Sequence, residues 1–151
     1  MKFENAAQEN AYQKVGQWLR EIFGEEGIIA VDERPLYLIP HGSALIECHI
    51  LPFKEKECII CNRSYVVYGP RFDESLYKFL LNENAKLTFG AFGVDSDGDI
   101  VYDHAIYGNT CDKEDLRASA IAVTVMADKY DDEIKARWGG KTTADRVNEG
   151  R

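Results

Sequence analysis

The chain of 151 residues has no apolar run long enough to cross a membrane, and its polar first ten residues, MKFENAAQEN, contain no secretory h-region. Basic residues are also scarce: 18 Lys and Arg stand against 26 Asp and Glu, a net charge of −8. Binding to nucleic acid or to an anionic membrane surface needs a basic footprint, so both kinds of partner are excluded. We therefore expect a cytoplasmic protein.

The sequence also lacks the short motifs of common enzyme classes, with no G-x-S-x-G, Walker loop, GxGxxG or HExxH. Its three histidines, His41, His49 and His104, are not paired with a nucleophile by short-range spacing. A triad assembled from distant positions stays open, because triads are recognised by geometry. We expect a protein that is not an enzyme, with no catalytic residues and no cofactor.

Only four cysteines are present, and in the cytoplasm we expect them to be reduced. Cys58 and Cys61 have the spacing of zinc or redox pairs, but residues three apart in a strand point to opposite faces. This pair therefore predicts no metal site. One register of the neighbouring hairpin would place Cys48 opposite Cys61.

The sequence does contain enough apolar residues, 45%, to build a core. Apolar spacings of three and four predict a helix over residues 7–23, a second helix after a cap at Asp73, and a third over residues 113–138 after a cap at Asp112. Strands are predicted over 36–39, 44–51, 58–68, 86–94 and 99–107. The sequence does not decide the secondary structure of residues 28–31. Residues 141–151 are expected to form a polar tail that is loosely ordered or weakly helical.

The last two strands are joined by Asp95-Ser96-Asp97-Gly98, and an Asp-Gly pair predicts a hairpin turn with positive φ at both central residues. The resulting order, α-β-β-β-α-β-β-α, lacks βαβ alternation and indicates an α+β domain with helices packed on an antiparallel sheet. We expect one such domain over residues 1–140, followed by the tail. Strand 44–51 alternates apolar residues with a mixed set that includes Glu47 and His49, which predicts one wetter face.

Several stretches resemble the YbjN-domain group, which is similar in fold to the type III secretion chaperones. They are Leu80-Leu81-Asn82-Glu83-Asn84, Phe89-Gly90-Ala91-Phe92, Asp97-Gly98-Asp99 and residues 127–134. The resemblance covers roughly residues 72–140. It implies a small, acidic, cytoplasmic homodimer that holds an extended peptide of a client protein and uses no nucleotide.

We accordingly predict a non-catalytic peptide- or protein-binding module, chaperone-like or regulatory, that holds its partner in apolar grooves or at a strand edge. One alternative is a small-molecule-binding sensor or minor enzyme with a pocket between helix and sheet. Another is a structural subunit of a larger assembly.

The second helix and the strand after it have an apolar surface that permits a two-fold contact between two copies of the chain. We predict a homodimer built on residues 76–92. Its interface is expected to contain Leu76, Phe79, Leu80, Phe89 and Phe92.

Overall fold

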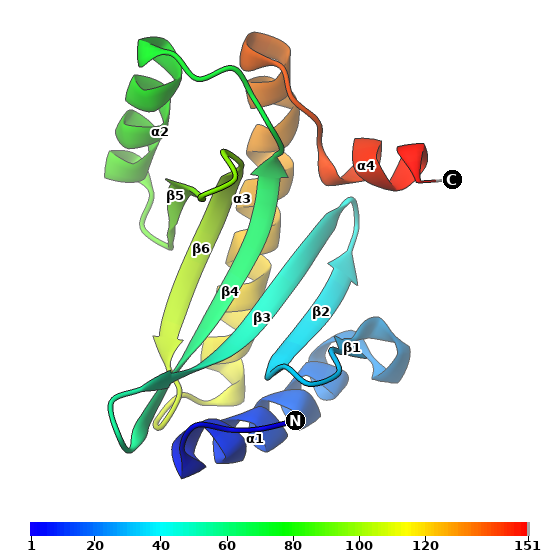
Figure 1. Ribbon diagram of the computed structural model, residues 1–151, viewed down its shortest axis with the longest axis vertical. Helices are drawn as coiled ribbons and strands as arrows, with labels where there is room; N and C mark the ends of the chain where they lie inside the picture. The colour runs from blue at the N-terminus through cyan, green and yellow to red at the C-terminus, as the bar shows by residue number, and fades with distance from the viewer. Residues whose placement is uncertain (151) are drawn as a thin grey trace.

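The computed structural model describes residues 1–150, which form helices α1 to α4, a short 3-10 helix η1 and a six-stranded sheet (Figure 1). In chain order the elements are α1 (Ala6–Phe23), η1 (Glu25–Gly27), β1 (Ile29–Ala30), β2 (Leu36–His41), β3 (Ala44–Phe53), β4 (Glu57–Val67), α2 (Glu74–Lys86), β5 (Ala91–Val94), β6 (Ile100–Tyr107), α3 (Lys113–Trp138) and α4 (Thr143–Glu149). The strands are antiparallel, in the order β1-β2-β3-β4-β6-β5. The predicted α+β class is confirmed.

Both predicted helix caps are present. The Asp73 carboxylate accepts the Leu76 N–H at 3.0 Å, and α2 starts at the next residue. Asp112 forms a reciprocal capping box with Asp115, each carboxylate accepting the other residue's backbone N–H. The side chains satisfy N–H groups that a helix start leaves without partners, so the two starts could be read from the sequence.

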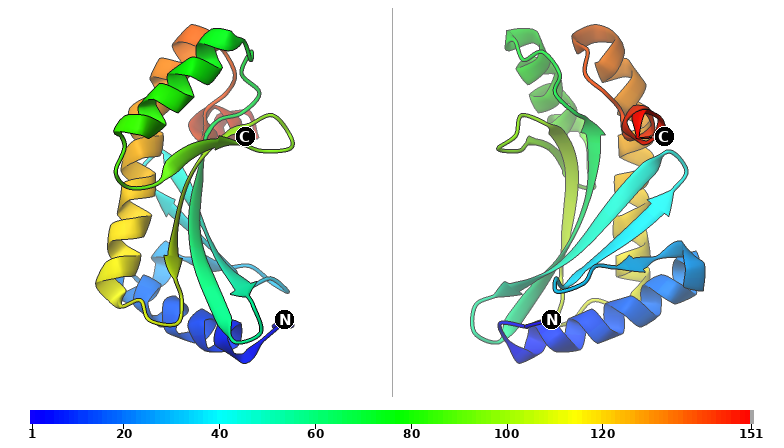
Figure 2. Two further views of the ribbon diagram at one scale, coloured as in Figure 1. Left: turned by 90° about the vertical axis from the view of Figure 1, so that its left-hand side faces the viewer. Right: turned by 45° about the vertical axis from the view of Figure 1, so that its right-hand side comes forward.

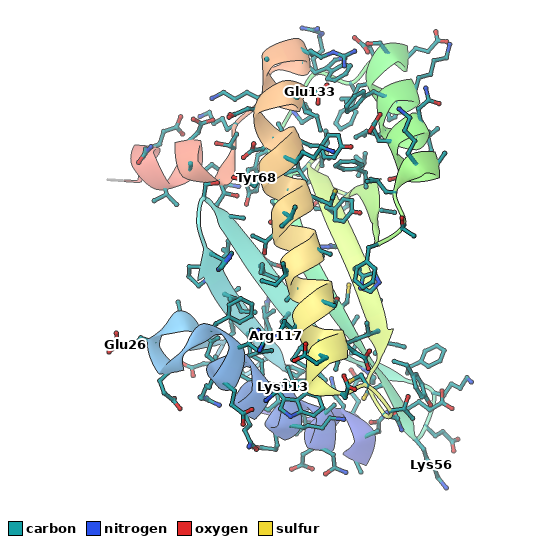
Figure 3. The ribbon with its side chains drawn as sticks, turned by 180° about the vertical axis from the view of Figure 1, so that it is seen from behind. Glu26, Lys56, Tyr68, Lys113, Arg117 and Glu133 are labelled. Carbon is teal, nitrogen blue, oxygen red and sulfur yellow. The ribbon has the colours of Figure 1, made fainter. Side chains whose placement is uncertain are left out.

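One face of the sheet is covered by α1 and α3, as Figure 3 shows from behind. Apolar residues that alternate along β3 and β4, such as Ile46, Ile50 and Ile60, point into this core and are fully buried. We call the other side of the sheet the open face; it looks toward the viewer in Figure 1. Its half-buried or exposed residues are Leu45, Glu47, His49 and Leu51 of β3, Ile59, Cys61, Arg63 and Tyr65 of β4, and Asp103, Ala105 and Tyr107 of β6.

The prediction for residues 86–94 is wrong at its start. Helix α2 continues through Asn84 to Lys86, and β5 begins only at Ala91. Between them Gly90 has φ +90°, and a Cβ there would lie 2.6 Å from the Asp103 carbonyl oxygen. This turn places β5 beside α2 at one edge of the sheet (Figure 2).

The hairpin turn is also built differently from the prediction. Gly98 has φ +81°, but Asp97 is not among the residues with positive φ. The Asp95 carbonyl accepts the Gly98 N–H at 3.1 Å, and the Asp95 carboxylate accepts the N–H groups of Asp97 and Asp99. The turn therefore needs one left-handed residue, because the Asp95 side chain holds the rest of the loop.

Three further details complete the comparison with the sequence. Residues 28–31 contain the two-residue strand β1, and the polar tail contains α4 after a capping box at Thr142. The register places Cys48 opposite Asn62, so the suggested pairing of Cys48 with Cys61 is not formed. Cys61 lies opposite His49 on the open face instead.

Candidate functional site

The structure brings one Ser–His pair together, but in a place where it cannot act on a substrate. His104 Nδ1 lies 2.8 Å from Ser119 Oγ, which also accepts a 2.8 Å hydrogen bond from Asn62 Nδ2. Ser119 and Asn62 are fully buried, and burial lowers the pKa of His104. The three side chains form a hydrogen-bonded link between α3 and the sheet. Because Ser119 is fully buried, a substrate cannot reach its hydroxyl group.

The cysteines occupy both sides of the sheet. Cys58 points into the core and Cys61 onto the open face, as the strand geometry required. All four thiols are free, and burial raises the pKa of the Cys48 thiol strongly. Within residues 1–150, no three His, Cys, Asp or Glu side chains are grouped as metal ligands.

The residues predicted for a dimer interface do not share one surface. Leu76, Leu80 and Phe92 are 0%, 5% and 7% exposed, because they pack in the chain's own core against α3. Phe79 is half-buried and packs against the Tyr130 and Trp138 rings. Phe89 is 40% exposed, so it is the one member of the predicted set with a large free surface.

Other apolar residues of the same segment do face outward. Tyr77 and Leu81 lie four residues apart on the outer side of α2 and are 49% and 68% exposed. We call these two residues the α2 patch; Phe89 lies apart from them, beyond the end of α2, where its ring stacks on His104. Apolar residues at spacing four with such exposure are typical of a helix face that another surface covers.

The open face combines a charged centre with an apolar end. Arg63 donates two hydrogen bonds to Asp103, at 2.7 and 2.6 Å, and this bond raises the pKa of the guanidinium. On the neighbouring strand β3, His49 Nε2 lies 2.9 Å from the carboxylate of Glu47, which stands two residues earlier on the same strand. Toward the β3–β4 turn the face is apolar, and its exposed members are Leu51, Phe53 and Tyr107.

The backbone edge at β5 is occupied by a side chain. Asn84 Oδ1 accepts the Phe92 N–H at 2.7 Å, and Asn84 Nδ2 donates to the Phe92 carbonyl at 3.1 Å. These two groups point away from β6 and would otherwise face an incoming strand. This edge is therefore closed at its centre.

The edge of β3 beyond the start of β2 is closed in a similar way. The Ile50 N–H donates to the Pro35 carbonyl at 2.9 Å, and the Ile50 carbonyl accepts from the buried Gln8 amide at 2.8 Å. The next outward position is Pro52, which has no N–H to offer. A strand could not be added here without breaking these bonds.

The remaining edge is β1. The Val31 N–H donates to the Leu36 carbonyl, so alternation turns the backbone groups of Ile28 and Ala30 outward. β2 extends beyond the short strand β1. In this extension the residue whose backbone faces outward is Pro40, which lacks an N–H group. Ile29 and Ala30 are exposed, and β1 is the last strand of the described sheet on this side. Of the edges compared here, β1 is the one where neither a proline nor a side-chain amide occupies the outward positions.

A separate cavity of about 500 Å³ lies between α1, the β3–β4 turn and the loop after β6. Ala7, Ala11 and Lys14 of α1 line it together with Lys56 and Asn109. The Lys14 ammonium group already bonds the Gly108 carbonyl at 3.1 Å. The cavity lies among loops at the end of α1, whereas the predicted alternative required a pocket between helix and sheet.

These features define an α+β binding module with a free strand edge and exposed apolar patches. The model of the family described as T3SS (YopN, CesT) and YbjN peptide-binding chaperone 1, TY-Chap1, matches residues 9–146. The match spans most of the chain, which therefore belongs to this family. The predicted resemblance is confirmed, as are the non-catalytic binding role and the absence of an enzymatic activity, since the family consists of peptide-binding chaperones.

A solved structure shows the same fold. The crystal structure of the ExsC–ExsE complex has a chain that is similar with a TM-score of 0.62 and 19% sequence identity, over 82% of this chain and 95% of that one. The Yersinia pestis type III secretion chaperone SycH, solved with a stable fragment of YscM2, has a TM-score of 0.49 and 18% identity, over 76% and 97%. No curated protein sequence matches the chain. No helix among residues 1–150 has both the length and the apolar character of a membrane span.

The sequence-based reading missed three parts of this site. The β1 edge is not predicted from the sequence, because a strand of two residues is too short to show a periodic pattern. Asn84 has no predicted role in the sequence, although an Asn side chain commonly bonds a nearby backbone group. Gln8 gave no signal, because its partner lies 42 residues away.

Proposed function

We propose that the chain binds an extended segment of a client protein by adding it as a strand to β1. The observation that supports this most directly is the contrast among the edges, in which Ile28 and Ala30 present outward backbone groups while the positions around Ile50 and Phe92 are bonded. Main-chain hydrogen bonds to an edge strand provide affinity without requiring one client sequence.

The side chains around β1 indicate which segment would fit. Ile29 is 52% exposed and lies beside Leu38 of β2 on the open-face side, so an apolar client residue can pack on this pair. Four exposed acidic residues flank the strand, two before it and two after it: Glu25, Glu26, Asp32 and Glu33. Opposite charges at the rim favour encounter and register, so the expected client segment is apolar with flanking Lys or Arg.

The test compares two substitutions at one position. Peptides that bind the parent are selected from a random library and titrated against Ala30→Pro and Ala30→Val. Proline removes the outward N–H, whereas valine keeps it and favours a strand, so we expect about a tenfold or greater loss of affinity for Ala30→Pro only. Equal affinities for the two variants would show that the peptide binds elsewhere.

We further propose that the chain forms a homodimer through the α2 patch in a reducing, cytoplasmic environment. The exposure of Tyr77 and Leu81 supports the contact, because a two-fold axis would bury the same two residues from both copies. The four free thiols and the net charge of −8 fit a soluble cytoplasmic protein.

Leu81→Asp tests the dimer, with Val147→Asp as the matched control. Both residues are exposed apolar positions on helices, at 68% and 52%, so neither substitution should unfold a single chain. An unpaired charge in a buried interface costs several kcal/mol, of the order of 3–5, so light scattering should find Leu81→Asp monomeric and the control dimeric. A dimeric Leu81→Asp would place the interface outside the α2 patch.

A further inference from the structure

The bond pair between Asn84 and Phe92 copies the pattern that an adjacent strand would make. In an antiparallel ladder one residue gives its N–H and its C=O to the same partner residue. Asn84 supplies both halves from a single side chain, with its oxygen 2.7 Å from the Phe92 nitrogen and its nitrogen 3.1 Å from the Phe92 oxygen. The side chain therefore takes the place of a seventh strand at this position.

The position of Asn84 is fixed by the elements on both sides of it. It lies in the last turn of α2, which Leu76 and Leu80 anchor in the core, while Phe92 is held by the Tyr102 and Tyr130 rings. Gly90 lets the chain between them turn sharply, since a Cβ there would also lie 2.8 Å from the Tyr102 ring. The amide is thus presented to the edge by rigid parts of the fold.

We propose that Asn84 is a built-in strand mimic that keeps the β5 edge from accepting β5 of a second copy of this chain. The geometry favours a second copy as the excluded partner, because a two-fold axis can pair one strand with itself in the antiparallel sense. Val94 lies on β5 itself and is 43% exposed, so such pairing would also bury an apolar side chain. An exposed edge with apolar neighbours is the usual starting point of unwanted strand pairing.

Asn84→Ala tests the inference, with Asn82→Ala as the control because Asn82 is exposed on the same helix. Amide hydrogen exchange is followed residue by residue at low and at high protein concentration. In dilute Asn84→Ala the Phe92 N–H loses its acceptor and should exchange about tenfold faster than in the parent or the control. At high concentration the protection of Phe92 should return, together with an assembly larger than that of the parent.

A second substitution identifies the contact in that assembly. Val94 is 43% exposed beside Phe92, and a Lys on an edge strand opposes pairing. Asn84→Ala/Val94→Lys should therefore keep the fast exchange of Phe92 but return to the parent's assembly state. Assembly that persists in the double variant would contradict pairing through β5.

Asn84→Ser serves as an independent variant if Asn84→Ala does not fold, since its shorter side chain cannot reach both backbone groups. Folded variants that retain the parent's exchange at Phe92 and the parent's assembly state would overturn the inference. A stability loss without concentration-dependent protection of Phe92 would also overturn it, because Asn84 would then be only a tie between α2 and β5. None of these measurements uses a client peptide, so their outcome is separate from that of strand addition at β1.

Discussion

The β1 edge and the β5 edge terminate the same sheet, yet they leave their outward backbone groups in different states. At β5 the N–H and C=O of Phe92 are both bonded to Asn84. At β1 the outward groups belong to Ala30, in the last strand of the described sheet, and to Ile28, the residue directly before that strand. Since an unpaired edge invites another strand, the difference indicates where a protein of this fold can take up an extended partner and where it cannot.

The difference extends to how firmly each edge is built. The β5 edge follows a helix anchored in the core and a glycine turn with no room for a side chain. The β1 edge is two residues long, lies between exposed acidic residues and buries neither of its side chains. A short strand of this kind can adjust to a partner, whereas β5 cannot move without disturbing the core around Tyr102.

Substituting Gly90 should have the largest effect on this comparison. In Gly90→Ala the new Cβ meets the Asp103 carbonyl and the Tyr102 ring at positive φ, so we expect a loss of about 2–4 kcal/mol in the free energy of unfolding. Gly42→Ala is the control, because it also has positive φ but has no atom within 4 Å of the new Cβ. Urea unfolding should show a clearly smaller loss for the control, and equal losses would mean that β5 yields easily.

Removing the Gln8 amide should have the next largest effect. Gln8→Ala leaves the Ile50 carbonyl without its side-chain donor in a buried position, which should cost about 1–3 kcal/mol. Gln13 is exposed on the same helix, and Gln13→Ala should change stability by no more than about 0.5 kcal/mol. Thermal melts that do not separate the two variants would argue against a closed β3 edge.

Gly98→Val should weaken the β5 side of the sheet by a smaller amount. Its φ of +81° is unfavourable for a β-branched residue, but its nearest contact is Phe72 at 3.9 Å, so the expected cost is strain alone, about 1–2 kcal/mol. A thermal melt measures the effect. An unchanged melting temperature would show that the turn can reorganise around Asp95.

The cysteine thiols allow the two faces of the sheet to be compared without any substitution. Cys48 is fully buried on the covered side, while Cys61 is half-buried on the open face. Alkylation of the native protein followed by mass spectrometry should therefore modify Cys61 well before Cys48. Similar rates at both positions would mean that the covered face opens frequently.

The sequence was sufficient for features with local causes. The caps at Asp73 and Asp112 and the end of α3 at Trp138 follow from side chains that bond or terminate a helix within a few residues. The alternation of β3 correctly indicated which of its residues meet the core and which lie on the open face. The fold class followed from these elements together with the order in which they occur.

The sequence was insufficient where a feature depends on elements that meet in three dimensions. The apolar side of the amphipathic helix α2 predicts that Leu76 and Leu80 are buried, but not whether the chain itself or a second copy buries them. The positive φ of Gly90 depends on the approach of β6, and the partner of Cys48 depends on the β3–β4 register. The roles of Asn84 and Gln8 require the strand positions to be known first.

The measurement that tests the central claim most directly is residue-resolved hydrogen exchange of the protein with and without a selected binding peptide. Strand addition at β1 predicts that the Ile28 and Ala30 amides become protected on binding, while Phe92 keeps the protection it already has from Asn84. Protection that appears elsewhere in the chain and leaves Ile28 and Ala30 unchanged would contradict the account.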